Sequence, residues 1–328
     1  MTEEVIEAIA AGQSRLGISV HNDIDGAHGV HIPLGSVVLI IDIQPIHNAY
    51  FALQAGAWRR IVMNLLANSL KYTFSGYIAV TLTIEESDYR GGAPRGTIAK
   101  LTVNDSGKGI SQQFLRERIF QAFTQENELN PGTGLGLNLV KKVVTALKGD
   151  IHIESEKGAF TNVTVTVPLV PVATPPDTLD QLLLSSLCSR MKGLTLHMVG
   201  FDATVEHETE AEAARRCASS SSKAHQLFKD SLQRLCKDTL EMNVISTRNI
   251  QEVERHEIKP DLCLVHPAIT SNGHLGVLKI LDQMNADPFK QSAPPVPIVF
   301  LCDKSSTAVA LETATSRSER SIQYLALP

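Results

Sequence analysis

Two asparagines and a lysine recur along one apolar segment at a spacing that could hold a metal ion and a phosphate. In WRRIVMNLLANSLKYT, residues 58–73, Arg60, Asn64, Asn68 and Lys71 fall at i, i+4, i+8 and i+11, along the edge of a core-facing helical stripe. An asparagine carbonyl can ligate Mg²⁺, and a lysine ammonium can neutralise phosphate. The same spacing also suits a solvated helix edge, so these residues alone leave both interpretations open.

A carboxylate followed by two glycines forms the second candidate. In VNDSGKGIS, residues 103–111, a strand ends at Asp105, and Gly107 and Gly109 follow. An ionised carboxylate only accepts hydrogen bonds, so a buried one can select the exocyclic amino group of adenine. Glycines would let a flat ring approach closely. An ordinary tight turn has the same pattern, and the residues do not choose between the two.

A glycine-rich stretch that enters a helix is the third candidate. PGTGLGLNLV, residues 131–140, would expose backbone N–H groups at a positive helix end, which suits an anion. It lacks the G-x-G-x-x-G spacing of dinucleotide sites, so a plain helix-entry turn remains the alternative. Upstream, Phe120 and Phe123 of IFQAFTQ lie three residues apart, which suits core packing or the anchoring of a mobile loop.

Composition limits the classes of function. The chain has 328 residues, 43% of them hydrophobic, with a net charge of −5, which indicates about two ordinary domains and argues against a broad nucleic-acid face. No stretch approaches the ~20 apolar residues of a membrane span, and the N-terminus is too acidic for a secretory signal, so we expect a cytoplasmic chain. Five cysteines without a C-x-x-C pair favour reduced thiols over disulfides or zinc.

The first half predicts an α+β sandwich with one mixed sheet, because paired strands are interrupted by separate helices. The expected helices cover 2–11, 55–72, 111–119 and 137–147. The expected strands cover 36–43, 76–86, 96–105 and two closing segments, DIHIES and TNVTVTVPL.

A proline-rich segment at 168–193 indicates a domain boundary followed by a connecting helix. Beyond it, short apolar runs alternate with helix-like segments, which predicts a doubly wound domain with five parallel strands and no last helix. The expected strands cover 194–201, 242–247, 261–266, 296–303 and 322–328. The serine-rich stretch 217–225 is expected to be a flexible loop.

Four motifs in one order resemble those of a known family. NLLANSLKYT, DSGKGI, IFQAFTQ and GTGLGL resemble the N, G1, F and G2 boxes of the histidine kinase catalytic domain, a member of the GHKL (Bergerat-fold) ATPases with gyrase, Hsp90 and MutL. The resemblance covers residues 1–170, and the short glycine loop is most similar to that of fungal hybrid kinases. It implies a GHKL α/β sandwich that binds ATP and Mg²⁺.

The resemblance also implies roles for individual residues. Asn68 would ligate Mg²⁺, Asn64 and Lys71 would take the catalytic positions near the phosphates, and Asp105 would read adenine. The nucleotide-binding set it implies is Asn68, Lys71, Tyr72, Asp105, Gly107, Gly109, Ile110, Phe120, Phe123, Gly132, Thr133, Gly134, Leu135, Gly136, Leu137 and Thr161. Phe160 stands where the family usually has a glycine before this threonine.

Asn64 separates reaction classes. Hydrolysing relatives carry a glutamate at this position, where it activates water, and an amide cannot take a proton. The resemblance therefore implies transfer of the γ-phosphate to another nucleophile, as in a protein histidine kinase acting in a phosphorelay. The alternatives are a nucleotide-binding scaffold or pseudokinase and, less favoured, an ATP hydrolase of the same superfamily.

None of the eleven histidines has the setting of a phospho-acceptor on a dimerisation hairpin. TEEVIEAIAAG resembles the segment that follows such a hairpin, so the resemblance implies either a fragment or a module that serves a hairpin in trans. The implied partners are this hairpin, in cis in a longer protein or in trans, and a response regulator or phosphotransfer protein downstream. Alone, the chain is expected to bind ATP without labelling itself.

The second half, 193–328 after a linker at 171–192, resembles a receiver domain of flavodoxin-like (βα)5 type lacking its last helix. The positions that carry receiver chemistry differ. Residues 199–201 lack the acidic pair and Asp202 is displaced, whereas His266, Cys302 and Leu327 replace the phospho-accepting aspartate, the hydroxyl residue and the lysine. The resemblance therefore implies a pseudo-receiver that serves as an interaction or spacing domain.

Overall fold

A computed structural model of the chain gives the fold. It describes residues 2, 5, 6, 37–44, 50–87, 96–126, 133–172, 179–201, 212–248, 260–266, 297–302 and 322–326. The chain divides into two units, and each has its own hydrophobic cluster. The first unit comprises Met1–Pro176 and Glu208–Leu227, and the second comprises Asp177–His207 and Phe228–Pro328.

Six strands form one mixed sheet in the first unit. The strands are β1 (Val37–Ile43), β2 (Tyr50–Ala52), β3 (Gly76–Ser87), β4 (Gly96–Asp105), β5 (Asp150–Glu156) and β6 (Phe160–Val172). Their order is β1-β3-β4-β6-β2, with β5 also paired to β6. The pair β1 and β3 is parallel and the others are antiparallel, so the predicted mixed sheet is confirmed. The three-residue β2 was not expected from the sequence.

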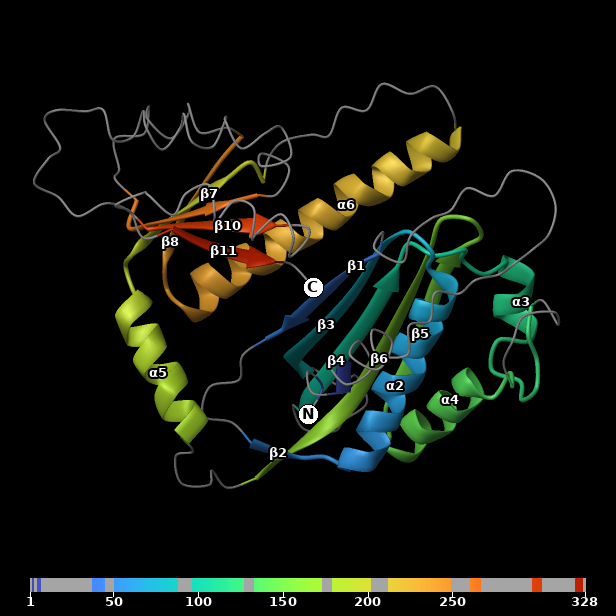
Figure 1. Ribbon diagram of the computed structural model, residues 1–328. Helices are drawn as coiled ribbons and strands as arrows, with labels where there is room; N and C mark the ends of the chain where they lie inside the picture. Colours follow the sequence, from blue (N-terminus) through green and yellow to red (C-terminus); the bar gives the residue numbers. More distant parts are fainter. Residues whose placement is uncertain are drawn as a thin grey trace, which may run out of the picture. The chain divides into compact units, whose positions relative to one another are not determined.

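Helices α2 (Ala55–Tyr72) and α4 (Gly136–Ala146) pack against each other and cover one face of this sheet (Figure 1). The predicted helix 55–72 has these same bounds, and the predicted helix 137–147 begins and ends one residue earlier. Helix α3 (Gln112–Glu117) is shorter than its predicted range. It begins after Ser111, whose hydroxyl accepts the N–H of Phe114 as an N-cap, and it ends before Arg118, whose backbone is no longer helical. Of the predicted helix 2–11, only Thr2, Val5 and Ile6 are described, and they are helical and buried.

Strand β4 explains how a carboxylate reaches the core. Its buried residues alternate with partly exposed ones, and Ala99, Leu101 and Val103 form one row that faces the hydrophobic cluster. Because side chains of a strand alternate between faces, Asp105 continues this row. The strand therefore delivers Asp105, which is 5% exposed, to the same face as α2.

The second unit contains five parallel strands. They are β7 (Thr195–Val199), β8 (Asn243–Thr247), β9 (Leu262–Val265), β10 (Ile298–Cys302) and β11 (Ile322–Ala326). Their order across the sheet is β8-β7-β9-β10-β11, which is 2-1-3-4-5 along the chain. Helix α5 (Leu179–Met191) precedes them, in the region where a connecting helix was expected.

The expectation of a loop at 217–225 is wrong. Helix α6 (Glu212–Arg234) runs through the serine-rich stretch and continues into a π-helical turn at Leu235–Thr239. Serine disfavours a helix by only a few tenths of a kcal/mol relative to alanine, and the flanking alanine, glutamate, leucine and lysine residues are good helix formers. Among the described helices, none is long and apolar enough to cross a membrane.

The core of the first unit gives a direct stability test. Ile61 is 0% exposed on α2, so Ile61→Ala should leave a cavity and lower the free energy of unfolding by about 2–5 kcal/mol. Met63, on the same helix, is 46% exposed, and Met63→Ala should change it by less than about 0.5 kcal/mol. Trp58, the single tryptophan, is buried in α2, so its fluorescence during urea unfolding reports on this unit. Equal effects of the two changes would contradict this packing.

Candidate functional site

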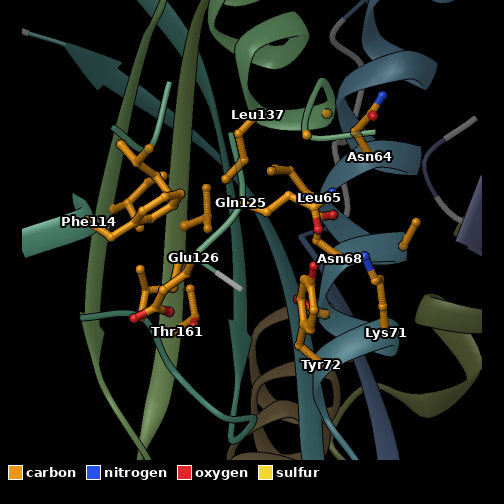
Figure 2. Close-up of a pocket in the computed structure, with 18 of the residues that line it drawn as sticks. Asn64, Leu65, Asn68, Lys71, Tyr72, Phe114, Gln125, Glu126, Leu137 and Thr161 are labelled. Atoms are coloured by element: carbon orange, nitrogen blue, oxygen red, sulfur yellow. The ribbon is translucent and has the colours of Figure 1, made fainter. Parts of the chain in front are cut away.

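A pocket of about 530 Å³ lies in the first unit, within the size range of small-molecule sites. In Figure 2, Asn64, Asn68 and Lys71 project from α2 on one side, and Phe114, Glu126 and Thr161 lie across from them. Most of the residues singled out from the sequence meet in this lining. They are Asn64, Asn68, Lys71, Tyr72, Asp105, Gly109, Ile110, Thr133, Gly134, Leu135, Gly136, Leu137 and Thr161.

Three described residues from the same set do not belong to the pocket lining. Gly107 donates its N–H to Asp105 Oδ1 instead. Phe120 packs against the hydrophobic cluster, and Phe123 is 78% exposed with a positive φ of 60°. Their three-residue spacing therefore does not place both rings on one buried face, because the chain turns between them. Gly132 lies outside the described residues.

Asp105 is a buried carboxylate with partners on both oxygens. The Ser69 hydroxyl donates to Oδ2 at 2.7 Å, and the Gly107 N–H donates to Oδ1 at 3.0 Å. Burial raises the pKa of Asp105 above its ordinary value, and these two hydrogen bonds together with Thr73 only partly offset it. Because each carboxylate oxygen accepts more than one hydrogen bond, Asp105 keeps acceptor capacity toward the pocket.

The turn after Asp105 is fixed on both sides by the backbone. Lys108 donates its N–H to the Tyr72 carbonyl of α2 at 3.1 Å, and its own carbonyl accepts the N–H of Gly158 at 2.7 Å. Gly109 has a φ of +63°, and a Cβ there would lie 1.9 Å from the Glu156 carbonyl oxygen. Any side chain at this position would push the turn away from the β5–β6 hairpin, so the glycine is required by close approach.

Thr161 is held in place through Ser155. The Ser155 hydroxyl accepts the N–H of Ile110 at 2.8 Å, donates to the Phe160 carbonyl and lies 3.1 Å from the Thr161 hydroxyl. The replacement of the family's glycine by Phe160 leaves Thr161 in the pocket lining. The hairpin therefore forms one wall of the pocket, in which Ser155 holds Thr161 by hydrogen bonds and Ile153 and Val163 add apolar surface.

The opposite end of the pocket is suited to phosphates. Helix α4 begins at Gly136 without a side-chain cap or an acidic residue in its first turn, so its first N–H groups are available to an anion. A Cβ on Gly136 would lie 3.2 Å from Asn64 Oδ1 and 3.7 Å from Asn68 Nδ2. The space between these two amide side chains and the start of α4 is the Gly136 cradle. A methyl group on Gly136 would fill it, and its size and donors suit a bound phosphate chain.

A Mg²⁺ ion in this pocket would have few protein ligands. Within the described ranges, no group of three or more His, Cys, Asp or Glu could hold a metal. Mg²⁺ commonly binds through one or two protein oxygens, with water and phosphate completing its shell. The Asn68 side chain, which supplies one such oxygen beside the Gly136 cradle, matches that requirement.

The segment before α4 is closed at its base. The Phe123 N–H donates to the Gly134 carbonyl at 3.1 Å, so the chain leaves and returns at neighbouring positions. The Thr124 hydroxyl, next along the chain, donates to carbonyl oxygens of Arg118 and Gln121. Phe123 and Gly134 are thus held next to each other, and Thr124 and Gly134 both line the pocket.

Several lining residues were missed by sequence reasoning. Ser69 could have been found from the sequence, because a serine in the apolar stripe of α2 requires a buried hydrogen-bond partner. That partner is Asp105. Lys108 could also have been found, because it lies between the two glycines of the turn. Glu126 could not have been found from a local pattern, since its partners are distant in sequence.

Burial alone would raise the pKa of Glu126, but hydrogen bonds from Ser111 and Lys157 outweigh the effect of burial and lower that pKa.

A buried carboxylate at one end and an open helix N-terminus at the other define an ATP-binding class of domain. Residues 54–171, which hold the whole pocket, match the family of histidine kinase-, DNA gyrase B- and HSP90-like ATPases. A domain of this family is therefore present in the chain.

Its relatives include sensor kinases. The chain is 31% identical over 115 residues to the sensor protein EvgS of Escherichia coli strain K12, which is 34% of this chain and 9% of EvgS. It is 35% identical over 130 residues to the autoinducer 2 sensor kinase/phosphatase LuxQ of Vibrio cholerae, which is 38% of this chain and 14% of LuxQ. The matched region thus spans less than a sixth of either relative.

A solved structure extends the likeness in fold. The crystal structure of full-length ShkA in complex with AMPPNP superposes with a TM-score of 0.53 at 17% identity. The superposition covers 99% of this chain and 52% of ShkA. At this identity the likeness concerns the fold alone.

The raised pKa of Asp105 predicts a pH-dependent stability. The folded state binds the Asp105 proton more tightly than the unfolded state, so the wild type loses stability as pH rises from about 4 through the folded pKa. Asp105→Asn is neutral and can still accept the Gly107 N–H, so it should be more stable than the wild type at neutral pH. The difference should shrink below about pH 4, as measured by urea unfolding followed through Trp58 fluorescence.

Asp150→Asn serves as the control of opposite sign. The Ile151 N–H and Lys141 hold the pKa of Asp150 below its ordinary value, so ionised Asp150 contributes stability that is lost as pH falls through its folded pKa. Asp150→Asn should therefore be slightly less stable than the wild type at neutral pH. A gain for Asp105→Asn that did not change with pH would contradict the assignment of a costly buried charge.

Proposed function

We propose that this chain is the ATP-binding catalytic module of a hybrid sensor histidine kinase. It would transfer the γ-phosphate of Mg-ATP to a histidine on a dimerisation hairpin, supplied in cis in a longer protein or in trans, within a cytoplasmic phosphorelay. The observation that carries the proposal is one pocket that joins buried Asp105 to Asn68 and the uncapped start of α4. The identity to sensor kinases over the same residues supports it.

The chemistry follows from what each side chain can do. Asp105 accepts a hydrogen bond from an exocyclic amino group, which favours adenine over guanine. The Asn68 carbonyl ligates Mg²⁺, and Lys71 and the α4 N-terminus bind phosphate oxygens. Bound Mg-ATP supplies the phosphoryl group, and the protein contributes positioning and neutralisation of charge.

Asn64 favours transfer over hydrolysis. Its Nδ2 donates to the Arg60 carbonyl of its own helix at 2.7 Å, which holds the amide against α2 while it lines the pocket. An amide cannot accept a proton from water, so this position offers no general base. Of the two enzyme alternatives, the ATP hydrolase is therefore the weaker.

We further propose a domain organisation of 1–170, a linker at 171–192 and a receiver-like domain at 193–328. The strand order 2-1-3-4-5 supports a flavodoxin-like second domain. His266, at the position of the phospho-accepting aspartate, is 4% exposed, and its ring packs edge-on against Phe201 at 4.9 Å. A buried histidine is poorly placed to receive phosphate, which supports a non-phosphorylatable pseudo-receiver with a binding or spacing role.

Ligand-dependent thermal stability tests binding. A ligand that binds only the folded state stabilises it, by about 2.7 kcal/mol at a hundredfold excess over Kd, so Mg-ATP should raise the Tm of the first unit. Asp105→Asn and Asn68→Ala should lose most of this shift, whereas Met63→Ala, outside the pocket lining, should keep it. No shift in the wild type would refute nucleotide binding.

Phosphate transfer separates the kinase from the scaffold. With γ-labelled ATP and an added dimerisation hairpin from a sensor kinase, label should appear on the hairpin and depend on Asn68. Binding without transfer to any hairpin would favour the scaffold, and release of labelled phosphate without an acceptor would favour the hydrolase. Label on this chain alone would contradict the need for a separate acceptor.

A further inference from the structure

Lys108 stands at the pocket on a backbone that cannot easily move. It lies between Gly107 and Gly109, and its own N–H and carbonyl bond to Tyr72 and Gly158. Its side chain is exposed and belongs to the pocket lining. The turn therefore places an exposed, flexible cation in the pocket lining on a fixed backbone.

Two ammonium groups meet at one aromatic ring. Lys108 Nζ lies 4.0 Å from the centroid of the Tyr72 ring, and Lys71 Nζ lies 4.6 Å from the same centroid. The ring attracts each cation weakly, by about 0.5–1 kcal/mol at an exposed site. In the part of the chain that the structure describes, neither lysine forms an ion pair with a carboxylate. Two neighbouring positive charges without a counter-ion favour the approach of an anion.

The sequence between Thr124 and Gly136 does not supply such charge. The segment 124–136 contains no lysine or arginine, whereas it contains Glu126 and Glu128. A triphosphate carries three to four negative charges, and after Mg²⁺ binding about two remain, which Lys71 and a helix end neutralise only in part. A second lysine, Lys108 in the turn after β4, would supply the missing positive charge.

We propose that Lys108 is a phosphate-positioning residue that, together with Lys71, grips the polyphosphate beside the Tyr72 ring. The pair makes the pocket selective for nucleoside triphosphates over the free nucleoside. This inference rests on the proposed binding of Mg-ATP and adds a cation that comes from the adenine-side turn. Part of the phosphate recognition then comes from the fixed turn after β4.

Calorimetric titration of the full chain with Mg-ATP and with adenosine tests the assignment. Lys108→Met keeps the aliphatic stem over Tyr72 and removes the charge, so it should weaken Mg-ATP binding about tenfold and adenosine binding less than twofold. Lys108→Arg keeps the charge and should stay within about threefold of the wild type for both ligands. Lys142→Met, an exposed lysine of α4 outside the lining, is the matched control and should bind both normally.

The outcomes separate this inference from the proposed function. If the wild type binds Mg-ATP and Lys108→Met binds it equally well, Lys108 has no phosphate role. If Lys108→Met weakens adenosine as much as Mg-ATP, the lysine shapes the pocket instead of contacting phosphate. If the wild type binds no Mg-ATP, both the proposed function and this inference fail.

Discussion

The buried carboxylate of Asp105 is the constraint on which the site depends. An ionised group in a protein core is tolerated only when hydrogen bonds replace its lost water, and Ser69 and Gly107 provide them. This requirement fixes α2 against the end of β4 and fixes the conformation of the turn. The turn in turn needs Gly109, because it passes within a Cβ's reach of the β5–β6 hairpin. A single carboxylate thus couples a helix, two strand ends and a loop.

Helix α2 links the two ends of the pocket. Its buried stripe packs on the sheet and includes Ser69, which holds the carboxylate, while its edge carries Asn68 and Lys71 toward the start of α4. The helix therefore sets the distance between Asp105, which we propose selects the base, and Asn68 and Lys71, which we propose contact the phosphates. In our proposal Lys108 adds a positive charge from the turn that follows Asp105.

Much of the first unit could be predicted because its signals are local. The 55–72 helix follows from the 3.6-residue period of its apolar positions, and β4 follows from a period of two that ends in Asp105. The failures were also physical. The serines at 217–225 carry only a weak propensity, which their helical neighbours override. Phe123 has the spacing of a core residue, yet the backbone takes a positive φ there and leaves the ring exposed.

The sequence by itself determined the kinds of group available for chemistry and their order along the chain: amides and a lysine on a helix, a carboxylate after a strand, and glycines before another helix. Only the tertiary structure decided which of them meet. The partnership of Ser69 with Asp105, the cradle at Gly136 and the position of Lys108 beside Tyr72 all join residues that are dozens of positions apart. Such contacts arise from sheet pairing and helix packing, whose geometry depends on the whole core and is not encoded in any local pattern.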